Sequence, residues 1–414
     1  MTTTPATSAD ATPRAGVVWD DALGRYDFGI GHPMDPVRLE LTHRLAVEAG
    51  LLGRPGVEIL PAPVASDEAL ATVHDPQYVA AVRAASDPRT RPSEEALLPY
   101  GLGSEDTPVF DGIHEASARL VGGTVEAMEA IRAGRVTRAV CFAGGMHHAR
   151  ASQAAGFCVY NDAAVAIRRA LAEGVERIVY VDLDAHHGDG VERALWDEPR
   201  AITISIHETG EVLFPGTGFV QDTGGAGAEG SAVNIPLPPR VDAGGWLRAV
   251  RATIPALVRA MRPTILVTQH GCDTHRDDPL ADLRLTVEGQ IGAMLLMREL
   301  ADEVCEGRWL ALGGGGYSVM DVVPRSWAAL VSIATGEPLP PDGPLPAGYV
   351  EHLREVAAAT AMPLPRRLST IGDGAVPHVR PWEDGYDPED PLDRAVQAAR
   401  RVAFPEWGLD PFYD

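Results

Sequence analysis

The segment 182–190 reads D-L-D-A-H-H-G-D-G and gathers carboxylates and imidazoles directly after an apolar run. Alternation along a strand places Asp182 and Asp184 on the same side, with His186 just beyond the strand end. Groups packed this tightly repel one another or stay unpaired in an apolar interior, and a cation at the strand tip removes that cost. The alternative is a hydrogen-bonded loop with solvated carboxylates. This cluster alone does not choose between the two.

A further carboxylate follows another apolar run. Residues 264–269 continue into H-G-C-D, so Asp273 lies just past a second strand end. Asp184, His186 and Asp273 together make a three-ligand set with an open position, the pattern of a catalytic zinc site. Fe²⁺ also suits carboxylate and imidazole ligands, so zinc is the first expectation and iron the second.

A tandem histidine provides groups that can move protons. The segment 144–149 reads G-G-M-H-H-A and again follows an apolar run. A pair of this kind is often only a polar turn. An imidazole near neutrality can, however, take a proton from water and return one to a leaving amine, which assigns that role to His147 and His148. Asp182 and Asp189 are candidates to hold the two rings.

The segment 313–317 reads G-G-G-G-Y. Glycines of this kind suggest a phosphate cradle, but the pattern G-x-x-x-x-G-K is absent, which argues against a P-loop. Two interpretations remain: a flexible turn with a buried tyrosine, or a Tyr317 hydroxyl that donates to a developing oxyanion.

The elements that must position these groups are short strands alternating with amphipathic helices. Strands are predicted at 16–19, 138–142, 177–183, 201–206, 264–269 and 308–312, and helical patterns at 114–133, 162–173, 246–261 and 287–304. This alternation predicts a parallel sheet with helices on both faces, in which ligands bind at the carboxyl ends of the strands. The reactive motifs lie where that rule requires.

Composition narrows the classes of function. The 414 residues carry a formal net charge of −23, and all 35 basic residues are arginines. This balance argues against a nucleic-acid partner and favours a cationic or neutral one. The four cysteines show no C-x-x-C spacing and no export signal precedes them, so we expect no disulfide framework and a reducing cytoplasm. No apolar run is long enough for a membrane span.

The chain is predicted to hold one catalytic domain over 16–362. Residues 1–15 are interpreted as a disordered tail. Proline-rich segments at 338–346 and 363–365 indicate that the compact domain ends nearby. An acidic extension, 363–414, follows with one helical stretch near 392–402 and no legible chemistry.

Five motifs in order resemble the histone deacetylase superfamily: G-G-M-H-H-A, D-L-D-A-H-H-G-D-G, F-P-G-T-G at 214–218, G-C-D and G-G-G-G-Y. The resemblance runs from G-H-P-M at 31–34 to about residue 334, and the bacterial acetoin-utilisation-type deacetylases, similar to class I enzymes, are the nearest subgroup. It implies an arginase/deacetylase-like α/β single domain with a central, mostly parallel sheet of about eight strands flanked by helices. It also implies hydrolysis of the amide of Nε-acetyl-lysine in proteins or peptides.

The resemblance assigns roles to individual residues. Zinc would bind at Asp184, His186 and Asp273; His147 and His148, supported by Asp182 and Asp189, would transfer protons; and Tyr317 would polarise the acetyl carbonyl. Gly156, Phe157, Phe214 and Leu280 would line the substrate tunnel, Asp106 would hold the substrate backbone, and Arg38 would lie in a cavity below the site. A structural K⁺ would lie beside Asp182, Asp184, His186, Ser205 and Ile206.

Departures from the family pattern define the alternatives. Leu280 occupies the position where polyamine deacetylases carry Glu, which disfavours an acetylpolyamine substrate. Asp35 and Pro279 stand where nuclear enzymes have basic residues for inositol phosphate, and Glu105 leaves the specificity of the rim open. A two-metal ureohydrolase would need more carboxylates than G-C-D-T-H provides. A non-catalytic acyl-lysine binding protein would be expected to lack a ligand, the histidine pair or the tyrosine, and none is missing.

Overall fold

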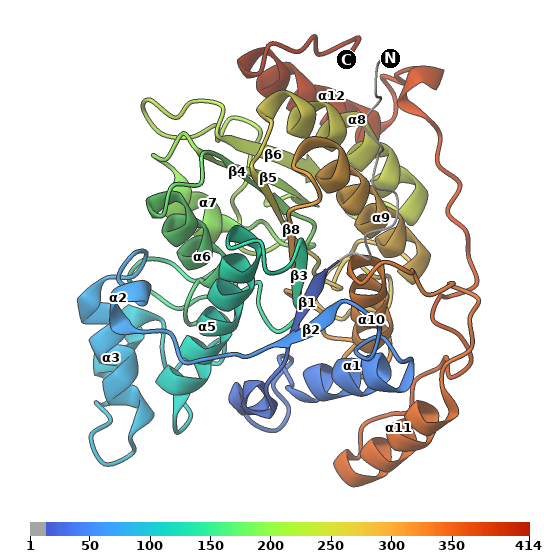
Figure 1. The fold of residues 1–414 in the computed structure, drawn as a ribbon. Helices are drawn as coiled ribbons and strands as arrows, with labels where there is room; N and C mark the ends of the chain where they lie inside the picture. The colour runs from blue at the N-terminus through green and yellow to red at the C-terminus, as the bar shows by residue number, and fades with distance from the viewer. Residues whose placement is uncertain (1–13) are drawn as a thin grey trace, which may run out of the picture.

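The computed structural model describes residues 14–414, and its centre is an eight-stranded sheet in the order β2-β1-β3-β8-β7-β4-β5-β6 (Figure 1). Every neighbouring pair within the described residues is parallel. The strands are β1 (Ala15–Val18), β2 (Val57–Leu60), β3 (Arg138–Cys141), β4 (Ile178–Asp182), β5 (Ala201–Glu208), β6 (Ala232–Leu237), β7 (Ile265–Gln269) and β8 (Trp309–Leu312). The predicted α/β domain with a central parallel sheet of about eight strands is therefore confirmed.

Helices cover both faces of the sheet. Helices α5, α6 and α7 lie on one side and α1, α8, α9 and α10 on the other (Figure 1). The helices are α1 (Val37–Glu48), α2 (Asp67–Leu70), α3 (Pro76–Ser86), α4 (Glu94–Leu97), α5 (Ile113–Arg132), α6 (Asp162–Ala172), α7 (Asp189–Leu195), α8 (Ala243–Met261), α9 (Val287–Val304), α10 (Val322–Ala334), α11 (Ala347–Thr360) and α12 (Pro391–Glu406). Because both faces are covered, the central strands are fully buried, as the run Ile178–Asp182 illustrates. None of the helices in residues 14–414 combines the length and apolar character needed to cross a bilayer.

The six predicted strands are present, and two edge strands were not predicted. Strand β2 has two exposed residues, so its sequence lacks the apolar run used to find the others. Strand β6 contains Asn234 and Pro236, which are unfavourable in a central strand but tolerated at a sheet edge. Strand β1 starts at Ala15, one residue before its predicted start, so the predicted tail 1–15 does not extend to Ala15. Residues 1–13 of that tail lie outside the described residues.

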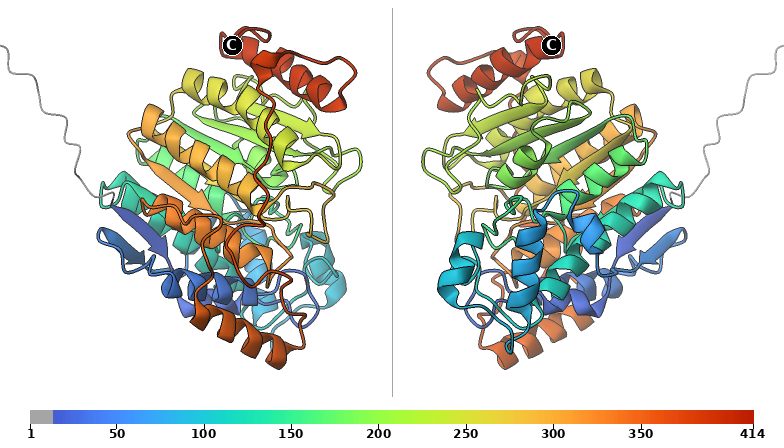
Figure 2. Two further views of the ribbon diagram at one scale, coloured as in Figure 1. Left: turned by 90° about the vertical axis from the view of Figure 1, so that its right-hand side faces the viewer. Right: turned by 90° about the vertical axis from the view of Figure 1, so that its left-hand side faces the viewer.

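The C-terminal extension packs on the body of the protein. Helix α12 matches the predicted helical stretch and lies against α8 and β6, at the opposite end of the molecule from α11 (Figure 2). Arg248 of α8 donates to both carboxylate oxygens of Asp393, at 2.8 and 2.9 Å, and both side chains are buried. A paired buried charge of this kind tethers the extension to the sheet layer.

Candidate active site

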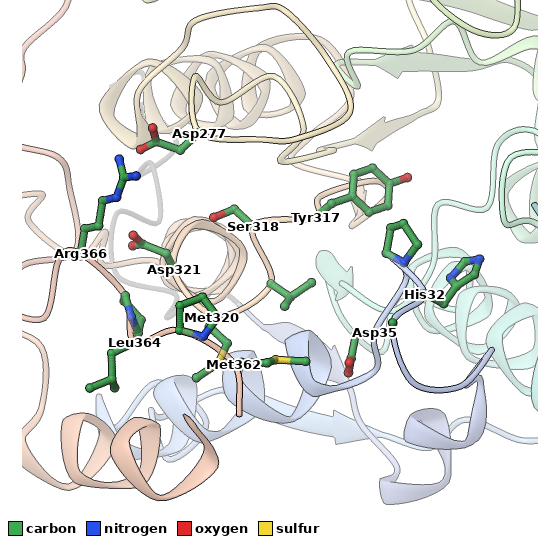
Figure 3. Close-up of a pocket in the computed structure, with 15 residues that line it drawn as sticks. His32, Asp35, Asp277, Tyr317, Ser318, Met320, Asp321, Met362, Leu364 and Arg366 are labelled. Atoms are coloured by element: carbon green, nitrogen blue, oxygen red, sulfur yellow. The ribbon is translucent and has the colours of Figure 1, made fainter. Parts of the chain in front are cut away.

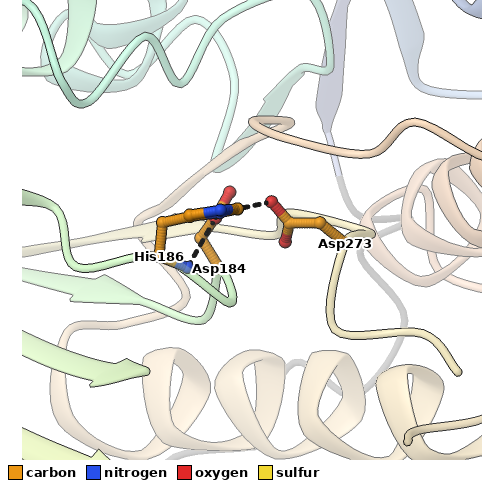
Figure 4. A group of neighbouring side chains, drawn as sticks. All are labelled: Asp184, His186 and Asp273. Carbon is orange, nitrogen blue, oxygen red and sulfur yellow. Dashed lines mark hydrogen bonds and ion pairs between the residues drawn. The ribbon is translucent and has the colours of Figure 1, made fainter. Parts of the chain in front are cut away.

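Three potential metal ligands meet at the carboxyl edge of the sheet. Strands β4 and β7 are neighbours, with Asp182 opposite Gln269, so the loops that follow them run side by side. His186 Nδ1 lies 3.2 Å from Asp184 Oδ1 and 3.0 Å from Asp273 Oδ2 (Figure 4). One donor atom from each of the three residues falls within 4.8 Å of the others, and all three side chains are buried. The structure thus brings together the set that the sequence predicted.

The backbone around the three ligands holds them in place. Gln269 Nε2 and the Gly315 N–H donate to Asp184 Oδ2 at 2.7 and 2.9 Å, and the Ala185 N–H donates to Asp273 Oδ1 at 2.9 Å. A Cβ on Gly315 would collide with both ligand carboxylates. The glycines of 313–316 therefore allow the backbone to approach the ligands closely, and the interpretation of this segment as a flexible turn is wrong.

The electrostatics of the three ligands fit a bound cation. Burial and the charge of Asp184 raise the pKa of Asp273 to about 8. The donor set consists of one imidazole and two buried carboxylates that disfavour joint ionisation, and glycines fit closely around it. Such a set suits zinc or another divalent cation. His186 also lines the adjacent cavity, so the set is open on the side from which a substrate arrives.

The tandem histidines form a connected chain with two carboxylates. Asp182 Oδ2 lies 2.8 Å from His147 Nδ1, and Asp189 Oδ1 lies 2.8 Å from His148 Nδ1. The two Nε2 atoms are 3.0 Å apart. Each ring is thus oriented through its Nδ1 by a carboxylate, which fixes its tautomer.

The two histidines have opposite proton affinities. Burial alone lowers the pKa of His147, but the charges of Asp182 and Asp184 outweigh it and raise that pKa to about 9. Burial and the neighbouring charge of His147 lower the pKa of His148 to about 4. At neutral pH, His148 is therefore the unprotonated ring of the pair. Such a pair can accept one proton at His148 and stabilise negative charge through His147.

Several supporting residues were missed by sequence reasoning. Asp162 is fully buried and accepts from the Gly145 and Met146 N–H groups at 2.9 and 2.7 Å, which holds the turn before the histidines. Tyr180 donates to Asp182 Oδ2 at 2.8 Å, and Arg150 donates to Asp189 Oδ2 at 3.0 Å. Of these supporting residues, only Arg150 could have been noticed in the sequence, because it directly follows the tandem-histidine motif.

A cavity of about 240 Å³ leads to this group. It is lined by all five residues predicted to bind the substrate, by three residues of the reactive group and by Leu213, which was not predicted: Asp106, His148, Gly156, Phe157, His186, Leu213, Phe214, Leu280 and Tyr317. The centres of the Phe214 and His148 rings are 5.0 Å apart, and the centres of the Phe157 and Tyr317 rings are 5.6 Å apart. Asp106 Oδ2 accepts from the Gly156 N–H at 2.8 Å, so this carboxylate also fixes the tunnel wall.

Two predicted accessory regions are also defined. Ser205 pairs with Asp182 across β4 and β5, which brings the five residues expected around K⁺ to neighbouring loops and strands. Arg38 donates to the Gly314 carbonyl at 2.9 Å and lies over the Trp327 ring, 5.0 Å from its centre. The cavity beside Arg38 measures only about 10 Å³, so the space below the site is almost filled by side chains.

Comparison with known proteins agrees with this geometry. Residues 32–334 match the family model described as the histone deacetylase domain. The acetoin utilization protein AcuC of Bacillus subtilis is 39% identical over 329 residues, covering 78% of this chain and 84% of that protein. AcuC of Staphylococcus xylosus is 36% identical over 345 residues, covering 83% and 88%. A crystal structure of an HDAC homolog complexed with SAHA superposes with a TM-score of 0.79 at 27% identity, covering 94% of this chain and 99% of that one. The chain is therefore a hydrolase of the histone deacetylase family and groups with the bacterial AcuC proteins.

Proposed function

We propose that this protein is a zinc-dependent lysine deacetylase, which hydrolyses the amide of Nε-acetyl-lysine in proteins or peptides to lysine and acetate. One observation carries the proposal: a single cavity with phenylalanine walls is lined by His186, His148 and Tyr317. The ligands Asp184 and Asp273 contact His186, and His147 contacts His148, so the whole reactive set adjoins this cavity. Phe157 and Phe214 suit the aliphatic stem of a lysine side chain. The polar groups at the floor suit the amide at its end.

Zinc held by Asp184, His186 and Asp273 would supply Lewis acidity toward the acyl oxygen and the attacking water. His148 Nε2 takes the proton from that water while Asp189 holds the opposite ring nitrogen. The Tyr317 hydroxyl stabilises the oxyanion by donating a hydrogen bond to it, and His147 supports proton transfer beside His148. The protonated imidazole then returns its proton to the departing amine.

Substrate size and cofactors follow the same reasoning. Leu280 itself brings no carboxylate to the tunnel, which disfavours an acetylpolyamine with a second amine as substrate. A structural K⁺ is proposed to bind beside Asp182, Asp184, His186, Ser205 and Ile206. Four free, buried cysteines support a reducing compartment, the cytoplasm.

The direct test measures acetate release from an Nε-acetyl-lysine peptide by zinc-loaded protein, with N-acetylputrescine assayed in parallel. Tyr317→Phe is the control, because loss of an oxyanion donor lowers the rate on the order of 10²–10³-fold while the metal stays bound. Peptide turnover that is lost in this variant supports the proposal. Turnover of the polyamine alone would make this a polyamine deacetylase. Binding of the peptide without turnover of either compound would leave an acyl-lysine binding protein.

A further inference from the structure

A second cavity, of about 510 Å³, is lined by the residues drawn in Figure 3, among them Tyr317, which also lines the substrate tunnel. Its walls come from the loop before α1, from Asp277, from residues 317–321 and from residues 362–366 of the chain's C-terminal part. We call it the Tyr317 groove, because Tyr317 lines both this cavity and the tunnel. A substrate residue close to an acetyl-lysine in the tunnel would therefore reach the groove.

The wall formed by residues 362–366 is anchored through the next part of the extension. Asp373 is buried and accepts from His275 Nε2 at 2.7 Å, from the Val287 N–H at 3.0 Å and from Arg325 Nη1 at 3.0 Å. Arg367 Nε, next to the groove wall, lies 3.3 Å from the same carboxylate. The wall is thus fixed to the loop that follows Asp273, so the groove is a built feature of the fold.

The groove combines an apolar lining with carboxylates at its two ends. Met320, Met362 and Leu364 provide apolar surface, and Leu364 is 47% exposed. Asp35 and Asp277 lie toward opposite ends (Figure 3). Asp277 makes no ion pair within residues 14–414 and is exposed.

The remaining charges of the groove leave it acidic. Asp321 is already paired with Arg325, whose Nη2 lies 2.7 Å from the Asp321 carboxylate. Arg366 is the basic side chain of the lining and lies on the side of Asp277 (Figure 3). His32 uses its Nδ1 to accept from the Met34 N–H, and its buried Nε2 has no partner among the described residues.

We infer that the Tyr317 groove binds an arginine or lysine side chain of the substrate, one or two residues from the acetyl-lysine. The aliphatic stem of such a side chain packs on the methionines and Leu364, and its charged head reaches Asp35 or Asp277. The net charge of −23 draws cationic peptides to the surface, and the groove selects among them. This inference rests on the proposed function and specifies its substrate class.

The test compares acetyl-lysine peptides that carry Arg, Gln or Glu at each of the two positions on either side. In the wild-type protein, Arg at one of these positions raises kcat/KM over Gln about two- to fivefold, mainly through KM, and Glu lowers it. The preference disappears in the double variant Asp35→Asn/Asp277→Asn. Asparagine preserves the hydrogen bond that Asp35 Oδ1 accepts from the Val37 N–H at 2.9 Å.

The matched control is Asp342→Asn/Asp384→Asn, which removes two exposed carboxylates that do not line the groove. This control keeps the preference for Arg. Any of three results would overturn the inference. The wild type could show equal kcat/KM for Arg and Gln peptides, the groove variant could keep the preference for Arg, or the control could lose that preference to the same extent. Turnover of the Gln peptide tests the proposed function separately. If that turnover is absent, fluorescence anisotropy of the same labelled peptides shows whether Arg still binds more tightly, and equal binding overturns the inference.

Discussion

Asp373 offers the sharpest test of how the C-terminal extension supports the site. In Asp373→Asn, the side chain keeps only one acceptor oxygen. Its NH₂ group takes the place of the other oxygen and cannot accept the hydrogen bonds that this oxygen accepted. The buried Arg325 and His275 then lose a partner that now lies 3.0 and 2.7 Å away. Breaking a buried ion pair costs about 3–5 kcal/mol, so the free energy of unfolding should fall by about 3 kcal/mol.

The effect should depend on pH in a defined direction. Burial alone would raise the pKa of Asp373, but the hydrogen bond and charge of His275 and the charge of Arg325 lower it well below its ordinary value. A carboxyl with a lowered folded-state pKa stabilises the fold above its unfolded pKa of about 3.9 and loses that contribution as the pH falls through the folded value. The wild-type advantage should therefore stay constant between about pH 5 and 7 and shrink below about pH 4, where the Asp373 carboxyl binds a proton in the unfolded chain but stays ionised in the folded protein.

The assay is urea unfolding of both proteins across this pH range, followed by circular dichroism, with Asp342→Asn as an exposed control. A loss of less than about 0.5 kcal/mol at pH 7 is typical of a surface substitution and would refute the assignment of Asp373 as a buried anchor. If the difference in the free energy of unfolding between the wild type and Asp373→Asn grew on acidification, the pKa of Asp373 would not be lowered in the folded protein.

Three further changes address the site itself. Asp273→Asn removes one of three ligands, so zinc bound after dialysis should fall from about one ion per chain to almost none by metal analysis; unchanged zinc content would place the metal elsewhere. Asp189→Asn leaves His148 without the carboxylate that orients it, and kcat should fall about 10–100-fold with zinc retained; an unchanged kcat would exclude Asp189 from the proton pathway. Leu280→Glu places a carboxylate at the tunnel mouth and should raise the ratio of N-acetylputrescine to peptide turnover; an unchanged ratio would show that Leu280 does not set this choice.

The sequence by itself determined the reactive groups and their general location. Apolar runs followed by D-L-D-A-H-H, H-G-C-D and G-G-M-H-H indicated buried strands with polar tips. In a parallel sheet all such tips lie on one edge, so the metal ligands and the histidines could be expected to converge before any coordinates existed. The five ordered motifs also led to the histone deacetylase family, which the comparisons confirmed.

Only the tertiary structure decided which tips are neighbours. Strand β7 lies between β4 and β8, so the loops carrying Asp184, Asp273 and Gly315 touch, although more than a hundred residues separate the first from the last. The roles of Asp162 and Asp373 were likewise unreadable, because a lone carboxylate at a helix start or in an extension has the same local pattern whether or not it is buried. Local periodicity reports which face of an element is apolar. It carries no information about a partner such as His275, 98 positions from Asp373, because that contact forms only when the helices and loops between them pack.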